Sequence, residues 1–597
     1  SPLSLSEFSA LLRPLPISAT EPLAVAVSGG PDSLALLLLL HQWAPTRVHA
    51  IIVDHLLRPE STAEAAAVAQ LIRDRGIPVT VKQIDWGNTP PSTIPTAQIE
   101  ERARVHRYRL LAQACTDLGA TKLFLGHHLN DQVETVMIRL ARSSGLGGLG
   151  GMGHGLQNLP IINRPEDHQV KVIRPLLTVP KSKLVGVCKQ MGIEYVVDRM
   201  NEDMSYQRNV VRDVLARTTA KAEEQAVASG KADDEWKYLT EESLTKFVEH
   251  MGEYASTANA FTNAILTKSV LTDHQTGSAF LHLPHLAKHP DHWFHHTHLA
   301  THVLGAIIRW IDCSPYPAPV GSVAMARDAM LAYYMHGLDP SAPPGTQQRW
   351  TPPPRVHEFK AVAVGKAIIT PPRPDRNGPG NWAIVRSPPI ASLRAKERLP
   401  LTSYADHVLF DARFFVQLAP ATVDADDPRM NLADFYRSLA SHLPFDPHAI
   451  RIRGIHPAVL GQPTHELIVR YLDREDEGAL TNVFRMRHVH PAWSQYRRAW
   501  EHYKRKMPVV SRFVVPVVAI REIEGAAKAA AAQARNVHEV VVKPARAGVE
   551  TKAKVGTPLG AVVAIPCLNI AFMPDVFAIN VSYRNTLVRT ATGGEES

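Results

Sequence analysis

A short apolar run, Leu23–Val27, is followed directly by a turn with two adjacent glycines and then by a second apolar run, Leu34–Leu40. This order predicts a buried strand, a tight turn and a helix, because glycine lets the backbone approach an anion without a clashing Cβ. A helix that begins at such a turn directs its unpaired N–H groups and its positive dipole end at the turn. The feature therefore predicts a phosphate cradle.

The turn reads Ser-Gly-Gly-Pro-Asp-Ser, and its two serines add hydroxyl donors. It matches neither the pattern G-x-x-x-x-G-K-[ST] nor G-x-G-x-x-G, so a Walker ATPase and a dinucleotide fold are both disfavoured. The alternative is an ordinary strand–helix turn that Asp or Ser caps. We expect six residues to bind phosphate: Ser28, Gly29, Gly30, Pro31, Asp32 and Ser33.

Residues 22–215 alternate apolar runs with longer helix-like stretches; the later runs are Val48–Val53, Val79–Ile84 and Leu123–Gly126. This alternation predicts an α/β domain with a parallel sheet covered on both faces, and continuous apolar strands are typical of such sheets. Ligands in these folds lie beyond the carboxyl ends of the strands. The polar residues after the second strand are Asp54, His55 and Arg58.

Two stretches carry polar residues on one helix face. Glu100, Arg104 and Arg107 are spaced i, i+4, i+7, and so are His127, Asp131 and Glu134. We expect both faces to converge beside the glycine turn, with salt bridges or helix packing as the alternatives. Further polar positions in the same part of the chain are His128, Arg208 and Arg212.

The Ser-Gly-Gly-x-Asp-Ser turn resembles the PP-loop of the ATP-pyrophosphatase superfamily, whose members cleave ATP between the α and β phosphates. The order and spacing of the segments around Asp54, Glu100–Arg107, Gly126–Glu134 and Arg174–Arg212 resemble the tRNA(Ile)-lysidine synthases over residues 20–215. One departure is Asn130, where the family often has an acid before Asp131. The run Leu409–Phe414 is similar to the longer, eukaryotic-type relatives.

The resemblance implies a ligase that joins free lysine to C2 of the wobble cytidine in tRNA(Ile) with a CAU anticodon, through an adenylated RNA. ATP and Mg²⁺ would be cofactors, with Asp32 as the first candidate metal ligand. It implies catalytic roles for Asp32, Asp131 and Glu134, and ATP binding by Ser28–Ser33, Asp54 and His55. Substrate or phosphate binding would fall to Arg58, Arg104, Arg107, His127, His128, Arg208 and Arg212.

The sequence predicts three parts: a catalytic domain over 1–217, a helical region over 218–339 and an α+β region over 340–597 that binds tRNA. Arg485–Lys506 holds seven basic residues against one acid, with aromatic residues on one helical stripe. An amphipathic helix with solvated charges is the alternative, and direct stacking of the aromatic residues on bases is a third reading. The tRNA-phosphate candidates are Arg497, Arg498, Lys504 and Arg505.

Net charge, the length of apolar runs and the cysteine content limit the partners and the compartment that the chain can have. The net charge of +8 permits a polyanionic partner, and no apolar run reaches the roughly 18–20 residues that span a bilayer. The four cysteines are widely separated, so the sequence has no CxxC pair, and this favours a reducing compartment. We expect the mitochondrial matrix, with the cytoplasm as the alternative. The histidine-rich stretch 282–302 lacks an HExxH pattern and is interpreted as a solvated helix.

Three other functions stay open. A PP-loop tRNA thiolase typically uses cysteine pairs, and an amidotransferase-type ligase needs a glutaminase; the sequence offers a motif for neither. An RNA-binding scaffold with a degenerate nucleotide pocket is the non-enzymatic alternative, and turnover of ATP to AMP would exclude it.

Overall fold

The computed structural model describes residues 1–87, 90–142, 144, 148–153, 155–160, 167, 169–195, 208–215, 217–218, 241–274, 276–283, 292–314, 317–336, 360–372, 380–388, 399–401, 407–410, 413–419, 465–471, 491–506, 516–522, 561–565, 570–571 and 578–583. The chain divides into two compact units, Ser1–Ala264 and Ile265–Ser597, and helix α9 (Glu241–Ser269) crosses the division. The three-part division at residues 217 and 339 stays a prediction. Among the described helices, none combines the length and apolarity that a membrane crossing requires.

The first unit contains a six-stranded sheet in the order β3-β2-β1-β4-β6-β5. Strand β1 pairs in parallel with both β2 and β4, so it lies inside the sheet as the apolar run predicted. Only β5 runs antiparallel, against β6. The strands are β1 (Leu23–Val27), β2 (Val48–Asp54), β3 (Val79–Gln83), β4 (Lys122–Phe124), β5 (Gln157–Asn158) and β6 (Lys171–Ile173).

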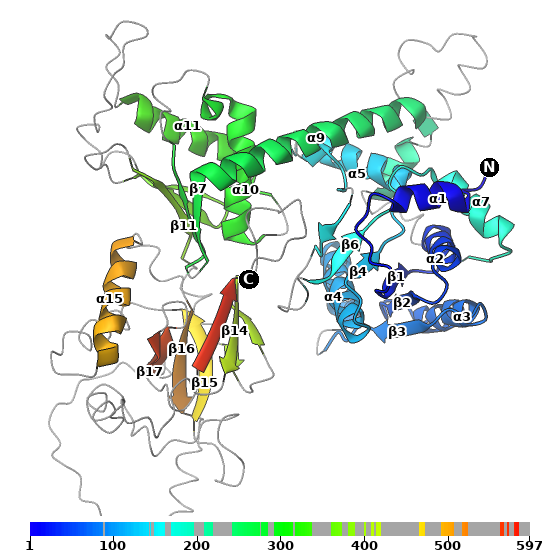
Figure 1. The fold of residues 1–597 in the computed structure, drawn as a ribbon, viewed down its shortest axis with the longest axis horizontal. Helices are drawn as coiled ribbons and strands as arrows, with labels where there is room; N and C mark the ends of the chain where they lie inside the picture. The colour runs from blue at the N-terminus through cyan, green and yellow to red at the C-terminus, as the bar shows by residue number, and fades with distance from the viewer. Residues whose placement is uncertain are drawn as a thin grey trace, which may run out of the picture. The chain divides into compact units, whose positions relative to one another are not determined.

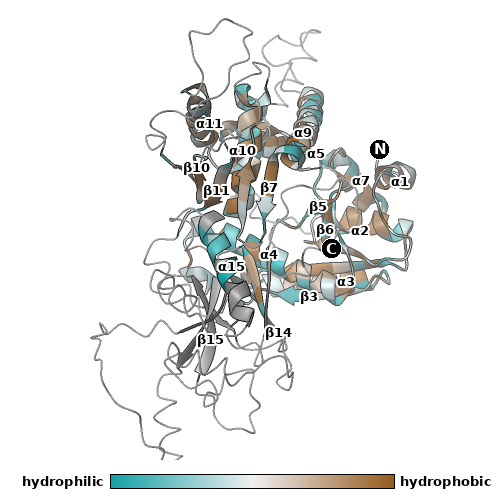
Figure 2. Cartoon of the chain, turned by 60° about the vertical axis from the view of Figure 1, so that its left-hand side comes forward, coloured by the Kyte–Doolittle hydropathy of each residue, from teal (hydrophilic) through white to brown (hydrophobic). Residues whose placement is uncertain are grey.

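Helices cover both faces of this sheet, with α2 and α3 on one side and α4 on the other (Figure 1). All seven residues of Leu34–Leu40 in α2 are buried, because this helix packs between β1, α1 and α7. Figure 2 shows the apolar colour concentrated on these inner elements. The bounds are α1 (Leu5–Leu12), α2 (Pro31–Trp43), α3 (Ser61–Arg73), η1 (Pro91–Thr93), α4 (Thr96–Asp117), α5 (Leu129–Ala141) and α7 (Lys181–Gln190).

The second unit begins with an antiparallel sheet in the order β7-β8-β11-β10-β9, packed against helices α10 and α11. Helices α9, α10 and α11 confirm the helical prediction for this stretch, but the sequence interpretation missed β7 and β8, which join strands beyond residue 339. The bounds are β7 (Val270–Asp273), β8 (Ser278–Leu281), η4 (Trp293–His295), α10 (Thr297–Asp312), α11 (Val320–His336), β9 (Val362–Val364), β10 (Ala367–Thr370) and β11 (Trp382–Arg386).

Among the described residues, two further antiparallel sheets and the helix α15 follow, as the α+β prediction requires. One sheet has the order β12-β15-β16-β17-β18, and the other has the order β13-β14-β19. The bounds are β12 (Leu399–Leu401), β13 (His407–Phe410), β14 (Phe414–Ala419), β15 (His465–Tyr471), α15 (Pro491–Lys506), β16 (Pro516–Glu522), β17 (Ala561–Ile565), β18 (Ile570–Ala571) and β19 (Ala578–Tyr583).

Candidate active site

The glycine turn joins the carboxyl end of β1 to the first residue of α2. Gly29 has a φ of +84°, which favours glycine, and Gly30 is the N-cap of the helix. Ser33 Oγ lies 3.1 Å from the Gly30 carbonyl oxygen and accepts the Ser28 N–H at 3.2 Å. These bonds hold the turn in a fixed shape before any anion arrives, with the N-terminus of α2 directed at it.

A second glycine lets another loop approach this turn. Gly126 follows β4, and a Cβ at this position would lie 3.0 Å from the backbone of Asp32 and from Ser33 Cα. Such contacts are shorter than real Cβ atoms normally make. Glycine at 126 therefore allows the residues that follow, His127 and His128, to enter the site beside the turn.

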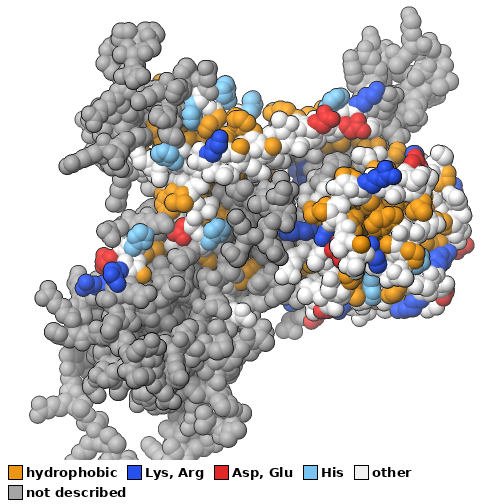
Figure 3. Space-filling model, viewed as in Figure 1, with side chains coloured by type: hydrophobic (Ala, Val, Ile, Leu, Met, Phe, Trp, Pro, Cys, Tyr) orange, Lys and Arg blue, Asp and Glu red, His pale blue; other side chains and the backbone are white. Residues whose placement is uncertain are grey.

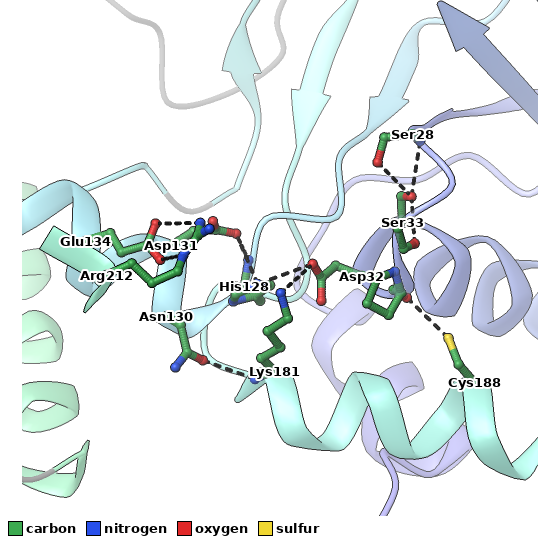
Figure 4. A network of polar contacts seen from close by, with 12 residues as sticks. Ser28, Asp32, Ser33, His128, Asn130, Asp131, Glu134, Lys181, Cys188 and Arg212 are labelled. Atoms are coloured by element: carbon green, nitrogen blue, oxygen red, sulfur yellow. Dashed lines mark hydrogen bonds and ion pairs between the residues drawn. The ribbon is translucent and has the colours of Figure 1, made fainter. Parts of the chain in front are cut away.

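Asp32 occupies the centre of the site (Figure 4). Its Oδ2 lies 3.4 Å from His128 Nε2 and 3.6 Å from Lys181 Nζ. Its Oδ1 is buried and has no hydrogen-bond partner among the described residues. Burial by itself raises the pKa of this carboxyl, but His128 and Lys181 outweigh burial and lower it. Asp32 is thus held ionised with one oxygen left for a ligand.

His128 connects Asp32 to the first turn of α5. Asp131 Oδ2 accepts the backbone N–H of His128 at 3.0 Å and lies 3.5 Å from its Nε2. The His128 side chain is almost fully buried, with 5% of its surface exposed. One imidazole therefore lies between two carboxylates that belong to different helices.

The next residues of this network are Glu134 and two arginines from the helical segment 208–215. Arg208 Nε donates to Glu134 Oε2 at 2.6 Å and Arg208 Nη2 donates to Asp131 Oδ1, while Arg212 Nε donates to Glu134 Oε1 at 2.7 Å. Burial raises the pKa of the Glu134 carboxyl, but the two guanidinium groups lower it overall. Glu134 is therefore an anion held on a mostly buried site.

His127 faces a cluster of guanidinium groups. Its Nδ1 accepts a hydrogen bond from Arg174 Nε at 3.1 Å. Burial, and then the charges of Arg174, Arg208, Arg107 and Arg104, place the pKa of His127 well below the ordinary value. The imidazole is consequently neutral at physiological pH and adds no charge to the guanidinium groups around it, of which Arg208 is paired with Asp131 and Glu134.

The α4 part of this cluster is arranged around the buried ring of Tyr108. The guanidinium carbons of Arg104 and Arg107 lie 5.1 and 5.3 Å from the ring centroid. Arg107 Nε is buried without a hydrogen-bond partner among the described residues. Burial raises the pKa of Tyr108, but Arg104, Arg107 and Arg174 lower it on balance. The cluster therefore suits an anionic group.

The residues at the carboxyl end of β2 and in the loop after it form contacts within their own segment. Asp54 accepts hydrogen bonds from Leu56 N–H, Ser61 and Thr62 at 2.7–3.0 Å, so it organises its own loop. The His55 carbonyl accepts from the Trp86 indole, and Arg58 forms an ion pair with Glu64 at 3.2 Å. Their roles toward ATP stay predictions, because these contacts are internal.

Sequence reasoning missed Lys181 and the contact that Asn130 makes with it. Lys181 is the first residue of α7, where a cation opposes the helix dipole, and that unfavourable placement is a usable signal of function. Asn130 Oδ1 accepts the Lys181 N–H at 3.1 Å, so it joins α5 to α7. The residue that replaces the family's acid thus has a structural contact.

The glycine-rich loop after α5 is anchored by α5 itself. Gln132 exchanges two hydrogen bonds with the Met152 backbone, at 2.6 and 2.9 Å, and Arg139 donates to the Gly148 carbonyl at 2.9 Å. Gly151 has a φ of +65°, and a Cβ there would lie 2.6 Å from Gln132 Oε1. The helix that carries Asp131 and Glu134 therefore also fixes this loop.

The predicted tRNA-binding residues lie on α15. Arg497 and Arg498 are exposed, and Trp500 and Tyr503 are buried with their rings stacked 5.7 Å apart. Lys504 pairs with Glu501 at 2.8 Å and lies over the Trp500 ring, so its charge is partly compensated. Figure 3 shows basic and acidic side chains together over this helix. The Arg505 side chain lies outside the described residues.

No metal cluster of three or more His, Cys, Asp or Glu side chains occurs in the part of the chain that the structure describes. Cys115, Cys188 and Cys313, the cysteines that the structure describes, are buried and form no disulfide with one another. Burial raises the pKa of the Cys115 thiol to about 12 and that of Cys188 to about 11. These thiols are therefore poorly suited to nucleophilic chemistry.

Residues 4–219 match a family model described as PP-loop domain. The chain is 38% identical over 224 residues to a tRNA(Ile)-lysidine synthase from Bradyrhizobium sp., which covers 37% of this chain and 58% of that protein. It is 40% identical over 196 residues to a tRNA(Ile)-lysidine synthase from Novosphingobium aromaticivorans, which covers 33% of this chain and 56% of that protein. The match thus spans little more than half the length of these relatives.

Solved structures give a weaker likeness. A U34-tRNA thiolase, NcsA from Methanococcus maripaludis with its [4Fe-4S] cluster, has a TM-score of 0.31 at 17% identity, covering 42% of this chain and 79% of that chain. An NH3-dependent NAD synthetase from Campylobacter jejuni has a TM-score of 0.24 at 10% identity, covering 42% and 96%. Residues 4–219 of the first unit thus match a PP-loop domain model, as the sequence resemblance predicted.

Proposed function

We propose that this chain is a tRNA(Ile)-lysidine synthase, a ligase that uses ATP to join lysine to C2 of the wobble cytidine in tRNA(Ile) with a CAU anticodon. The observation that carries the proposal is one polar network: the PP-loop carboxylate Asp32 reaches the Asp131–Glu134 pair through His128. The two relatives described above, which match this part of the chain, are named tRNA(Ile)-lysidine synthase. AMP and pyrophosphate are the products beside the modified RNA.

The first step activates the cytidine. Its C2 oxygen attacks the α-phosphorus of ATP, the bond to the α–β bridging oxygen breaks, and pyrophosphate leaves with that electron pair. The N–H groups at Gly29 and Gly30 and the N-terminus of α2 stabilise the negative charge on the phosphates. Because the turn is already fixed by Ser28 and Ser33, little reorganisation is needed.

Mg²⁺ fits this site on the chemistry of its donors. Asp32 Oδ1 is an ionised carboxylate oxygen, buried and without a partner among the described residues, and Mg²⁺ prefers such oxygen ligands together with substrate phosphates. Asp32 would hold the ion through Oδ1. When bound, Mg²⁺ neutralises charge on the phosphate oxygens.

The second step forms the carbon–nitrogen bond. The ε-nitrogen of lysine attacks C2, the C2–O bond breaks, and AMP leaves with that oxygen. Free lysine has an ε-amino pKa of about 10.4, so the amine must lose a proton at the site. Glu134, whose pKa is lowered, and Asp131 are the two carboxylates of the site that can orient the ammonium group and take its proton.

The arginines of the candidate site and of α15 fall into three groups, which would bind a small anion, the carboxylates of the site and tRNA. Arg104, Arg107 and Arg174 surround the neutral His127 and suit a phosphate or the lysine α-carboxylate, since a guanidinium donates in a fork. Arg208 and Arg212 hold the two carboxylates in place. On α15, Arg497 and Arg498 are exposed and suit tRNA phosphates.

The test is incorporation of labelled lysine into RNA. The full chain is incubated with ATP, labelled lysine and a tRNA(Ile) that carries a CAU anticodon. We expect label in the RNA together with one AMP per lysine, and no label with Asp32→Ala or when the wobble base is uridine. AMP formation without label in the RNA would overturn the proposed lysine transfer.

A further inference from the structure

Lys181 has no role in the steps above, although it is one of only two side chains that contact Asp32 in the described part of the chain. Its Nζ lies 3.6 Å from Asp32 Oδ2, and 48% of its side-chain surface is exposed. We propose that Lys181 is a further catalytic residue, which binds the β and γ phosphates of ATP and then the departing pyrophosphate. The inference rests on the proposed function only in that the site cleaves ATP between the α and β phosphates.

The backbone of Lys181 is fixed to both sides of the site. Asn130 Oδ1, on α5, accepts its N–H at 3.1 Å. Further along α7, the Cys188 thiol donates to the Pro31 carbonyl in the PP-loop at 3.3 Å. Figure 4 shows the Lys181 side chain reaching from α7 toward Asp32, beside His128. Only the flexible side chain therefore has to move for Nζ to reach a phosphate.

The charge at this point favours an additional anion. Lys181 is the first residue of α7, and the first turn of that helix has no acidic residue. A cation at a helix N-terminus is electrostatically unfavourable, because the helix dipole is positive there. Asp32 supplies a single negative charge, whereas the triphosphate of ATP carries several. Phosphate oxygens beside Asp32 would therefore compensate both Lys181 and the helix ends.

The chemistry needs a cation on the leaving-group side. As the bond between the α-phosphorus and the bridging oxygen breaks, the electron pair goes to the β phosphate and its negative charge grows. In this role Lys181 donates N–H bonds to those oxygens and transfers no proton. An interaction that strengthens as this charge develops raises kcat rather than ATP affinity alone.

Lys183 on the same helix provides a matched control. It pairs with Glu7 on α1 at 3.0 Å and is 35% exposed, so it has similar chemistry but a partner outside the site. Lys181→Met removes the charge and keeps the length, Lys181→Arg keeps the charge, and Lys183→Met removes an equivalent charge elsewhere. Thermal unfolding of each full-length variant reports whether the fold is kept.

The experiment measures AMP release with tRNA and lysine present, together with product inhibition by inorganic pyrophosphate and by AMP. For Lys181→Met we expect about a 100-fold lower kcat and about tenfold weaker inhibition by pyrophosphate, with inhibition by AMP unchanged. Lys181→Arg should recover most of both losses, and Lys183→Met should match the wild type. Unchanged kcat and pyrophosphate inhibition in Lys181→Met, or equal loss of AMP and pyrophosphate inhibition, would overturn the inference.

Calorimetric titration of the tRNA-free full chain with inorganic pyrophosphate separates this inference from the proposed function. Weaker binding to Lys181→Met than to Lys183→Met supports the role of Lys181 even if labelled lysine never enters the RNA. Equal binding by both variants contradicts that role even if lysidine forms.

Discussion

Both units bury arginine–carboxylate pairs, but the two networks differ in how open they are. In the first unit, Glu134 is 5% exposed while its partners Arg208 and Arg212 are 41% and 37% exposed. In the second unit, Arg386 and Asp312 are 5% and 11% exposed, and Arg386 also donates to the Asp312 carbonyl at 2.7 Å. A network that is closed on all sides stabilises a fold, whereas one that opens on one side can exchange a partner for a substrate.

The contacts of Arg327 support this distinction. Its guanidinium donates to the carbonyls of Phe294 and His295, so it caps a turn of the second unit. In the first unit, Asp32 and Arg107 each keep a buried polar atom without a partner among the described residues, and Trp382 Nε1 is such an atom in the second unit. Buried polar atoms normally have partners. At Asp32 and Arg107, which belong to the candidate site, a ligand can supply the missing partner.

The largest effect should come from Asp32→Ala. AMP formation should fall by about 10³-fold or more, since the change removes the carboxylate at the centre of the phosphate site. The thermal unfolding midpoint should change little, because Asp32 is partly exposed. Asp117→Ala, an exposed position paired with Lys82, is the control and should retain wild-type AMP formation. Near-normal turnover by Asp32→Ala would remove Asp32 from the mechanism.

Glu134→Gln should separate the two chemical steps. We expect about a 100-fold loss of lysine transfer and of the AMP release that accompanies it, with a much smaller loss of pyrophosphate release in the first turnover, because Glu134 lies beyond His128 and Asp131 from the PP-loop. The measurement is the ratio of modified RNA to pyrophosphate in a single turnover. A ratio equal to that of the wild type would show that Glu134 has no part in the second step.

The matched change in the closed network is Asp312→Asn. It leaves Arg386 without its buried anion and should destabilise the second unit by about 3 kcal/mol, measured as a lower denaturation midpoint. AMP formation at a temperature where the chain is folded should be unchanged. If this variant instead lost ATP cleavage while folded, the distinction between open and closed networks would fail.

Gly126 in the first unit and Gly305 in the second unit differ in the space that a Cβ atom would have. Gly126→Ala places a Cβ 3.0 Å from the PP-loop backbone, so we expect about 1–3 kcal/mol lower stability and slower AMP formation. Gly305→Ala in α10 meets no atom within 4 Å and should raise stability by about 0.5–1 kcal/mol. Equal thermal shifts for the two variants would contradict the close approach at Gly126.

A further effect on stability depends on pH. Because His127 is neutral when folded, only the unfolded chain takes up its proton below pH 6.5, so stability falls as the pH falls. Relative to His127→Gln, the wild type should lose up to about 1.4 kcal/mol per pH unit below that value. His302→Gln, where burial alone lowers the pKa, should show the same sign at smaller size. Parallel pH curves for wild type and His127→Gln would exclude this reading.

The sequence predicted the first unit well for physical reasons. The apolar run Leu23–Val27 can only be buried, and the glycines after it need conformations that few other residues adopt. His128, Asp131 and Arg208 were also found, since polar residues at strand ends and on one helix face have few structural uses. Lys181 was missed, because its relation to Asp32 depends on packing between α2 and α7 that no local pattern encodes.

The second unit was harder to predict because its contacts are distant in sequence. Strand β8 pairs with β11 about a hundred residues later, and β14 pairs with β19 across a longer separation. Short strands of this kind carry little signal, and their pairing depends on burial in the complete sheet. The exposed positions of Arg497 and Arg498 followed from helical periodicity, whereas the Glu501 ion pair of Lys504 did not.

We expect the first unit to carry the chemistry and the second unit to carry affinity for tRNA. Steady-state kinetics over a range of tRNA and salt concentrations, with Glu134→Gln beside the double variant Arg497→Ala/Arg498→Ala, separate the two roles. Glu134→Gln should have a lower kcat with an unchanged KM for tRNA. The double variant should keep its kcat and have a higher KM, with a salt slope smaller by roughly 0.7–0.9 for each phosphate that the arginines no longer neutralise. A double variant with a reduced kcat at saturating tRNA and an unchanged KM would contradict this division.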